Sequence, residues 1–311
     1  MRHDRPAELV VGSVQLGLPY GAANRAGLPS REAALRLVRR AANSGIRNFD
    51  TARAYGESEE RLGEALAGDR AVRTITKLSP LSGLSPDAAR ADVIAAVDAS
   101  IAQSLAALRR DRLDCLLLHR AAHMTAHGGA IWERLIEYLE DGALLSLGVS
   151  VQSPAEAIEA LVQADVRHLQ LPFNLLDWRW REAGVIERLR ARPDVTVHAR
   201  SVFLQGVLAA NDASVWPRVA GADPRRLIAW IDDTVRDHGR ESAADLCLAF
   251  VRGQAWIDGV VVGMEAEDQL EANLRFFARP PLSAPDCMAI AANAPRVPEA
   301  LLDPSCWPAR P

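Results

Sequence analysis

Four ionisable side chains lie at or just beyond the ends of three consecutive predicted strands. Asp50 and Tyr55 fall in NFDTARAY, Lys77 ends the alternating segment VRTITK, and His119 ends the apolar segment LDCLLLH. In a parallel α/β fold the carboxyl ends of neighbouring strands meet at one rim, so we expect these four side chains to lie together. A carboxylate, an ammonium, a phenol and an imidazole in one place form a set that can transfer a proton.

The expected chemistry depends on Tyr55. A free phenol has a pKa of about 10, so a tyrosine exchanges a proton near neutral pH only where its surroundings favour the phenolate. We expect Asp50 to keep Lys77 charged, and Lys77 to favour the phenolate of Tyr55. Tyr55 would then donate a proton, and His119 would orient a substrate carbonyl. Taken singly, each residue also fits a structural ion pair, a core histidine or a surface aromatic.

The chain has the alternation of strands and helices that a barrel needs. We predict strands at 9–14, 46–50, 72–77, 113–119, 145–149, 166–171, 195–199 and 257–262. A helix capped by Ser30 and stopped at Gly45 is predicted, another begins at Ser153-Pro154, and further helices are predicted at 57–67, 87–108, 131–139, 178–190, 224–237, 242–252 and 267–277. This order predicts a single α/β domain, a (β/α)8 TIM barrel at 1–280 with a tail at 281–311 that wraps it and contains one short helix. An open doubly wound sheet is the alternative, weakened because no G-x-G-x-x-G follows the first strand.

The composition narrows the possible partners. The 311 residues include 36 basic and 40 acidic side chains, a net charge of −4, and no basic face for nucleic acid is predicted. The four cysteines have neither disulfide-framework nor zinc-ligand spacing, so no metal site is expected. The N-terminal MRHDRPAELV lacks the apolar core of a signal peptide, and we found no run of 18 apolar residues. These features predict a cytoplasmic protein without a membrane span.

Several motifs, in order along nearly the whole chain, carry a family resemblance. They are VQLGLPYG, FDTARAYG, ITKL at 75–78, LLLH at 116–119, GVS at 148–150, QLPFNLL at 170–176, SVFLQGVL at 201–208, and VVVG with Q-L-x-x-N at 260–273. Together they resemble the aldo-keto reductase family of bacterial type. The resemblance implies a (β/α)8 barrel that reduces aldehydes and ketones with a nicotinamide cofactor, usually NADPH. It also implies that Asp50, Tyr55, Lys77 and His119 are the catalytic tetrad.

The resemblance further implies a set of cofactor-binding positions. Asp50 and the loop after the first strand would lie under the nicotinamide, a second pair would bind its carboxamide, and later segments would hold the pyrophosphate and adenosine. In that order the positions are Gly12, Ser13 and Val14; Ser150 and Gln170; Ser201 and Phe203; and Gly263, Gln269 and Asn273.

Two positions depart from the family pattern. Arg200 stands where many members have an aromatic residue that stacks on the nicotinamide. A guanidinium can also stack on a ring, or it can meet an anionic group of a substrate. The segment 263–269 contains Glu265, Glu267 and Asp268 where a basic residue usually binds the 2′-phosphate of NADPH. Acids repel a phosphate, so NADH is the alternative cofactor.

The resulting hypothesis is an oxidoreductase that transfers a hydride from NAD(P)H to an aldehyde or ketone, with a sugar-like substrate as one option. The alternative is a nicotinamide-binding regulatory or partner subunit with little turnover, because a shared fold does not fix function. We expect a small carbonyl compound as the partner and a monomer or weak homo-oligomer. Substrate specificity is expected from the loops at 18–29, 123–129 and 173–178 and from the tail around Trp307. His123 and His127 are interpreted as exposed loop residues rather than metal ligands.

Overall fold

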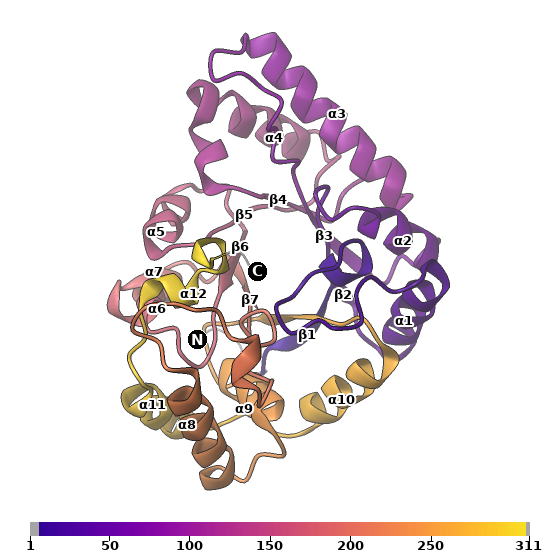
Figure 1. Ribbon diagram of the computed structural model, residues 1–311. Coiled ribbons are helices and arrows are strands. Elements are labelled where there is room, and N and C mark those ends of the chain that lie inside the picture. The colour runs from indigo at the N-terminus through magenta and orange to yellow at the C-terminus, as the bar shows by residue number, and fades with distance from the viewer. Residues whose placement is uncertain (1–5, 309–311) are drawn as a thin grey trace.

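The computed structural model describes residues 6–308, and its centre is a closed barrel of parallel strands (Figure 1). Each strand pairs with its neighbours in chain order, and β1 closes the barrel against β8. The predicted (β/α)8 architecture is confirmed. The strands are β1 Glu8–Gly12, β2 Asn48–Asp50, β3 Arg73–Lys77, β4 Cys115–Leu118, β5 Leu147–Ser150, β6 His168–Pro172, β7 Thr196–Arg200 and β8 Gly259–Gly263.

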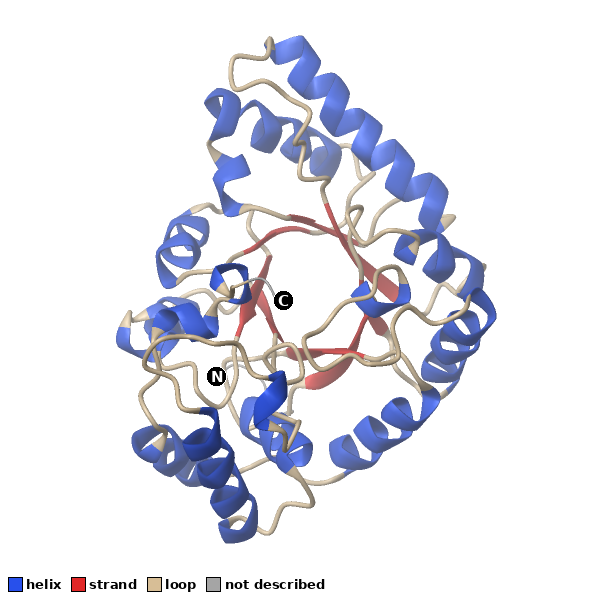
Figure 2. Cartoon of the chain, viewed as in Figure 1, coloured by secondary structure: helices blue, strands red, loops and turns tan. Residues whose placement is uncertain are grey.

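Helices form a ring outside the strands (Figure 2). The strands are therefore covered on both faces, which explains why β4 is apolar throughout and wholly buried. The helices are α1 Arg31–Asn43, α2 Ser58–Ala65, α3 Arg90–Leu108, α4 Ala130–Glu140, α5 Pro154–Val162, α6 Arg179–Glu182, α7 Val185–Arg190, α8 Pro224–Asp237, α9 Ala243–Arg252, α10 Glu267–Ala278, α11 Ala284–Asn293 and α12 Glu299–Leu302.

Local sequence signals set several helix starts. The Ser30 hydroxyl accepts a hydrogen bond from the backbone N–H of Ala33 at the start of α1. At the start of α5, Ser153 and Glu156 form a reciprocal capping box. These caps satisfy backbone donors that a helix leaves unpaired at its first turn. They therefore fix where the chain leaves each strand-end loop.

Three helix predictions need correction. The long helix expected from residue 87 begins only at Arg90. The helix expected at 178–190 is divided into α6 and α7 at Gly184, whose φ of 71° is left-handed and interrupts the helix. The tail contains two helices, α11 and α12, rather than one, and their buried residues Ile290 and Leu301 join the core of the barrel.

Helix α3 is apolar and long enough to meet a length-and-composition criterion for a membrane span, although the sequence analysis expected none. One face of α3 is buried, with Val93, Val97 and Ile101 in the core. The helix also contacts α2 and α4. A helix that packs on a protein core meets the same criterion.

Candidate active site at the carboxyl rim

A buried ion pair forms the base of the site. Lys77 Nζ lies 2.8 Å from both carboxylate oxygens of Asp50 and 2.8 Å from the carbonyl oxygen of Thr51. Lys77 is 1% exposed and Asp50 4% exposed. Burial opposes the charge on Lys77, but attraction to Asp50 outweighs it and raises the pKa of the lysine. Lys77 therefore remains an ammonium at neutral pH.

Tyr55 and His119 lie beside this pair. Lys77 Nζ is 5.0 Å from the centroid of the Tyr55 ring, and that ring meets His119 edge-on with centroids 5.8 Å apart. The three hydrogen bonds of the ammonium go to Asp50 and Thr51, so Lys77 acts on Tyr55 through its electric field. All four residues predicted as a tetrad are thus brought together at one rim.

His119 is a neutral imidazole in this environment. Burial and, to a smaller extent, the positive charges of Lys77, Arg200 and Arg120 together lower its pKa to about 3. A neutral imidazole has one N–H donor and one acceptor nitrogen. Its Nδ1 atom is buried and has no hydrogen-bond partner among residues 6–308. His119 can therefore offer a hydrogen bond to a neutral carbonyl without adding a charge.

Buried hydroxyls fasten the end of β1 to the end of β2. Ser13 Oγ donates to the carbonyl of Asp50 at 2.7 Å, and Ser58 Oγ contacts Ser13 Oγ at 2.6 Å. Thr51 Oγ1 lies 2.9 Å from Ser58 Oγ. These contacts hold the backbone on both sides of Asp50, so the carboxylate has a fixed position.

Two glycines allow the first two strand-end loops to touch. A Cβ on Gly17 would lie 1.8 Å from the carbonyl oxygen of Tyr55, and one on Gly56 would lie 2.3 Å from the carbonyl oxygen of Gly17. Gly56 also has a left-handed φ of 55°. We refer to this reciprocal approach of Gly17 and Gly56 as the glycine contact. It places the backbone of Tyr55 directly against the loop that follows β1.

A cavity of about 910 Å³ opens above these residues. Asp50, Tyr55 and His119 line its floor, and Lys77 and Gln170 lie beneath it. Most of the positions predicted to bind a cofactor also line it: Gly12, Ser13, Val14, Ser150, Arg200, Ser201, Phe203, Gly263, Gln269 and Asn273. Catalytic and cofactor candidates therefore share one continuous space.

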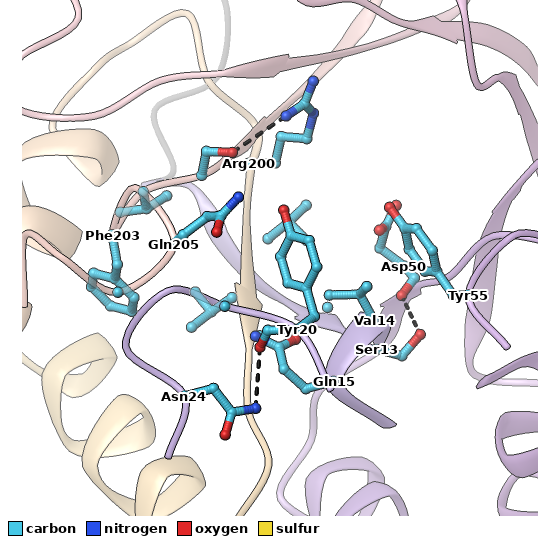
Figure 3. A pocket seen from close by; sticks show the side chains of 18 of the residues that line it. Ser13, Val14, Gln15, Tyr20, Asn24, Asp50, Tyr55, Arg200, Phe203 and Gln205 are labelled. Carbon is cyan, nitrogen blue, oxygen red and sulfur yellow. Dashed lines mark hydrogen bonds between the residues drawn. The ribbon is translucent and has the colours of Figure 1, made fainter. Parts of the chain in front are cut away.

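Several cavity residues were not singled out in the sequence. Tyr20 is 40% exposed, yet Figure 3 shows its ring standing between Gln205 and the Asp50–Tyr55 pair. Burial of the phenol raises the pKa of Tyr20, with Tyr55 acting in the same direction. Gln152 and Arg120 also line the cavity. The proline, glycine and aromatic residues of the loop at 18–29 were the available signal for Tyr20, but nothing in their spacing indicates where the ring points.

The loops expected to set specificity contribute unequally. The loop at 18–29 and the residues just after His119 line the cavity, whereas 123–129, 173–178 and Trp307 are not part of its lining. Among residues 6–308 no group of three or more histidine, cysteine or acidic side chains has the geometry of a metal site, so His123 and His127 form no such group.

Two loops meet across the mouth of the cavity. The backbone N–H of Ala23 donates to the carbonyl of Gln205 at 3.1 Å, and Arg25 pairs with Asp212 at 2.8 Å. These contacts join the loop after β1 to the loop after β7. The loop after β7 also contains left-handed non-glycine residues at Ser201, Leu204 and Gln205. Backbone held in this region costs free energy and persists only where its surroundings fix it.

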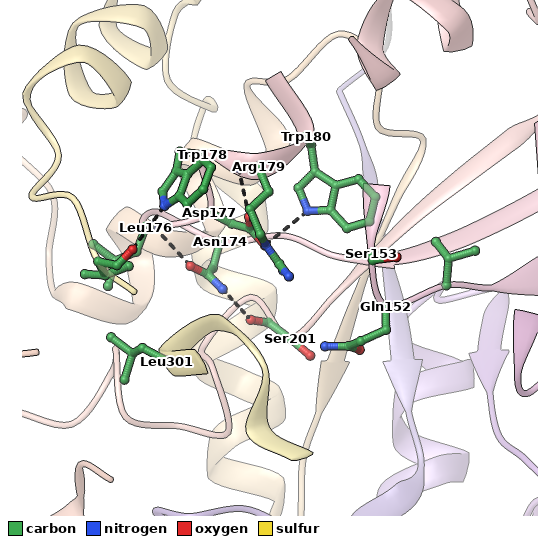
Figure 4. Close-up of polar contacts among 12 residues, drawn as sticks. Gln152, Ser153, Asn174, Leu176, Asp177, Trp178, Arg179, Trp180, Ser201 and Leu301 are labelled. Carbon is green, nitrogen blue, oxygen red and sulfur yellow. Dashed lines mark hydrogen bonds and ion pairs between the residues drawn. The ribbon is translucent and has the colours of Figure 1, made fainter. Parts of the chain in front are cut away.

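The loop after β6 supports the end of β7 (Figure 4). Asp177 accepts hydrogen bonds from Arg179 and from the indole N–H of Trp180, while the Asn174 side chain donates to the carbonyl of Ser201 at 3.5 Å. Asp177 and Trp180 are buried. This polar network anchors the residue that follows Arg200.

Arg200 reaches across the strand ends instead of presenting an aromatic face. Its guanidinium donates to Gln152 Oε1 at 2.7 Å, to the carbonyl of Val151 at 3.2 Å and to Ser201 Oγ at 3.3 Å. All three partners are neutral. Arg200 is half-buried and faces the cavity.

The β8 end of the cavity is acidic. Glu265 lines it, and the backbone N–H of Glu265 donates to Gln269 Oε1 at 3.0 Å. Two arginines on α1 are already paired with α10, because Arg36 and Arg40 both contact Glu267 and Arg40 also contacts Glu271. Of the three acids noted in this segment of the sequence, Glu265 lines the cavity, whereas Glu267 and Asp268 are not part of its lining.

Two buried amide oxygens have no hydrogen-bond partner among the described residues. Gln170 donates through Nε2 to Asp50 at 2.6 Å, which leaves its Oε1 unpaired, and Oε1 of Gln15 in the cavity wall is also unpaired. Buried polar atoms normally have partners. A bound group with N–H donors, such as a carboxamide, would satisfy the oxygen of Gln170.

A histidine pair lies deeper in the barrel, beneath the site. The rings of His168 and His198 meet edge-on with centroids 4.2 Å apart, and His168 Nδ1 contacts Cys115 Sγ at 3.4 Å. Burial lowers the pKa of His198 to about 3. Burial also raises the pKa of Cys115 to about 12, so its thiol stays protonated at neutral pH.

The closed parallel barrel defines the chain as a (β/α)8 barrel, and its polar groups gather at the carboxyl rim, where barrels of this kind place their active sites. The model of the aldo/keto reductase family matches residues 8–293. The chain therefore belongs to the aldo-keto reductase family, whose members are oxidoreductases acting on carbonyl compounds. The resemblance seen in the sequence is confirmed.

Solved structures with this fold include members of the same family. One is an aldo-keto reductase from Bacillus halodurans in its holo form, with a TM-score of 0.75 and 21% identity over 94% of this chain and 93% of that chain. A putative aldo-keto reductase from Pseudomonas aeruginosa has a TM-score of 0.63 and 22% identity, covering 87% of this chain and 89% of that chain. At these identities the likeness shows the fold alone. A search of curated proteins gave no match.

Proposed function

We propose that the protein is a nicotinamide-dependent carbonyl reductase in which Tyr55 donates the proton. The observation that carries this proposal is the buried Lys77–Asp50 pair, with Nζ 2.8 Å from both oxygens, lying under Tyr55 and beside a neutral His119. A fixed ammonium near a phenol stabilises the negative charge that remains when the phenol gives up its proton.

Each side chain has a separate task in the proposed reaction. Tyr55 gives its proton to the carbonyl oxygen, and Lys77 stabilises the resulting phenolate. Asp50 keeps Lys77 charged and in place. His119 hydrogen-bonds the carbonyl oxygen and orients it. When bound, a reduced nicotinamide supplies the hydride for the carbonyl carbon.

The residues that would hold the cofactor run from the tetrad to α10. Ser150 and the unpaired Oε1 of Gln170 would bind the carboxamide, Ser201 and Phe203 would contact the pyrophosphate, and Asn273 would lie at the adenosine end. The holo form of the Bacillus halodurans structure supports a bound cofactor in this fold.

We further propose that NADH is favoured over NADPH. Glu265 faces the cavity at the end assigned to the adenosine, and Arg36 and Arg40 are already paired with acids on α10. An added 2′-phosphate would bring about two negative charges towards Glu265 and would have to compete for these arginines.

The proposed role of Tyr55 is tested by Tyr55→Phe, measured with NADH and a panel of aldehydes and ketones. Loss of a general acid should reduce turnover by about 100-fold or more. Cofactor affinity, followed by fluorescence titration, should stay within about threefold. Tyr138→Phe is the matched control, because Tyr138 lies on α4 outside the cavity lining and bonds Asp98. Turnover that is unchanged in Tyr55→Phe would refute the assignment.

The same measurements distinguish a carbonyl reductase from the alternative, a nicotinamide-binding partner subunit. A nicotinamide-binding partner subunit would bind the cofactor but would reduce none of the carbonyl compounds, even with the wild-type tetrad. Turnover by the wild-type protein that depends on Tyr55 excludes this alternative.

A further inference from the structure

Arg200 carries a charge that its protein neighbours do not neutralise. Its three hydrogen-bond acceptors are an amide oxygen, a carbonyl and a hydroxyl, on Gln152, Val151 and Ser201. Among residues 6–308 no carboxylate forms an ion pair with it within 4.0 Å. A half-buried charge without a counter-ion is unfavourable, and an incoming anion would relieve this. The guanidinium also has more N–H donors than these three contacts use.

The acids that line the same cavity are already engaged or distant. Asp50 is paired with Lys77, and Glu156 accepts hydrogen bonds from the backbone N–H groups of Gln152 and Ser153. Glu265 belongs to the β8 end. The region around His119 is therefore positive, as its lowered pKa, caused by burial and then by Lys77, Arg200 and Arg120, also indicates.

The orientation of Arg200 distinguishes two anions that it could bind, a charged group of the substrate and the pyrophosphate of the cofactor. Its side chain extends from the end of β7 towards the loop after β5, where Gln152 and Val151 hold it. In Figure 3, Arg200 lies on the opposite side of Tyr20 and Gln205 from Asn24 and Gln15. This direction leads away from β8 and the segment that would hold the adenosine. A carboxylate or phosphate carried by the substrate fits this position better than the pyrophosphate of the cofactor.

We infer that Arg200 recognises an anionic group on the substrate, so that the preferred substrates are oxo acids or carbonyl compounds that bear a phosphate. This inference rests on the proposed carbonyl reductase function and names its substrate class. Gln152 holds the guanidinium in position, and His119 and Tyr55 act on the carbonyl oxygen of the same molecule. Arg200 is thus a specificity-determining residue.

The test compares 4-oxobutanoate with its methyl ester, which has the same carbonyl but no charge. In the wild-type protein kcat/KM should favour the carboxylate by about tenfold or more. Arg200→Gln should lower this preference by about 10- to 100-fold, as expected for a lost hydrogen bond to a charged group. Arg200→Lys should restore part of it. Arg181→Gln is the matched control, because Arg181 is also half-buried and donates to the neutral Gln254 Oε1 at 3.0 Å but lies outside the lining of this cavity, and its removal should change the preference by less than about threefold.

Binding measurements complete the test and distinguish the possible failures. NADH affinity should stay within about threefold in Arg200→Gln, and binding of 4-oxobutanoate to the NAD⁺-saturated protein should weaken about as much as the kinetic preference. If NADH affinity falls while the preference is unchanged, the guanidinium belongs to the pyrophosphate and the inference is wrong. Reduction of the ester without any preference for the acid also overturns it, but leaves the proposed reductase function intact. Absence of turnover with both compounds contradicts the reductase function, and the binding arm still decides the role of Arg200.

Discussion

Replacing Lys77 by methionine tests whether the buried ion pair serves stability or function. The variant removes the ammonium but retains most of the side-chain volume. It leaves Asp50 as a carboxylate that is 4% exposed and that has, among residues 6–308, only Gln170 as a side-chain hydrogen-bond partner, at 2.6 Å. Removing one partner of a buried pair costs about 3–5 kcal/mol. We therefore expect the free energy of unfolding to fall by that amount.

The double variant Asp50→Asn, Lys77→Met should recover much of this loss. An asparagine at 50 still accepts the hydrogen bond from Gln170 but carries no charge. The remaining cost is the unpaired carbonyl of Thr51, about 1–3 kcal/mol. In a double-mutant cycle the coupling free energy between the two substitutions should therefore be about 2 kcal/mol or more. We expect neither variant to reduce carbonyl compounds.

Urea denaturation followed by circular dichroism measures both differences, provided that the slope m is the same for all variants. Asp50→Asn alone completes the double-mutant cycle. A cost below about 1 kcal/mol for Lys77→Met would contradict the reasoning, because it would mean that Asp50 is not a buried, uncompensated charge in that variant. A double variant that is less stable than Lys77→Met would contradict it as well.

Three further predictions concern other parts of the structure. The pKa of His198 is about 3 in the folded protein and about 6.5 in an unfolded chain, so between these pH values only the unfolded state binds the proton. The free energy of unfolding therefore falls by about 1.4 kcal/mol for each pH unit as pH drops through this window. His198→Gln should flatten the pH dependence of the urea midpoint between pH 6.5 and 4, and an unchanged slope would contradict this. Glu265→Arg should change the relative affinity of the two cofactors in favour of NADPH by about tenfold or more, measured as dissociation constants by fluorescence titration. Tighter binding of NADPH than of NADH by the wild-type protein would show the proposed preference to be wrong. Gly17→Ala should lower the free energy of unfolding by about 1–3 kcal/mol and should reduce kcat by a larger factor than Ala23→Ser, because the new Cβ displaces the Tyr55 backbone; wild-type kcat in this variant would refute the role of the glycine contact.

The strands and the grouping of Asp50, Tyr55, Lys77 and His119 at one rim were predictable because their signals are periodic or lie at strand ends. A strand buried on both faces is often a short apolar run, so a polar residue directly after it, such as His119 after β4, is visible in the sequence; Lys77 instead ends the alternating sequence of β3. Parallel strands with alternating helices then place those ends on one rim. The start of helix α8 also has a local signal in the sequence, because Asp223 caps the helix and Pro224 is its first residue.

The cavity wall was less predictable because loops have no period. The break between α6 and α7 depends on the left-handed φ of Gly184, which a glycine permits but does not require. Tyr20 enters the cavity because its loop meets Gln205, 185 residues further along the chain, and no local pattern encodes that contact. The direction of Arg200 likewise depends on acceptors from the loop after β5.

The glycine contact divides the first loop into a part that cannot vary and a part that can. Up to Gly17 the backbone touches the main chain of Tyr55, so any added side chain or inserted residue there would shift Tyr55, the proposed proton donor. Beyond Leu18 the loop runs to the far side of the mouth and makes no backbone hydrogen bond to the tetrad residues among residues 6–308. Evolution or engineering can therefore rebuild residues 19–29 to admit new substrates while Tyr55 keeps its place.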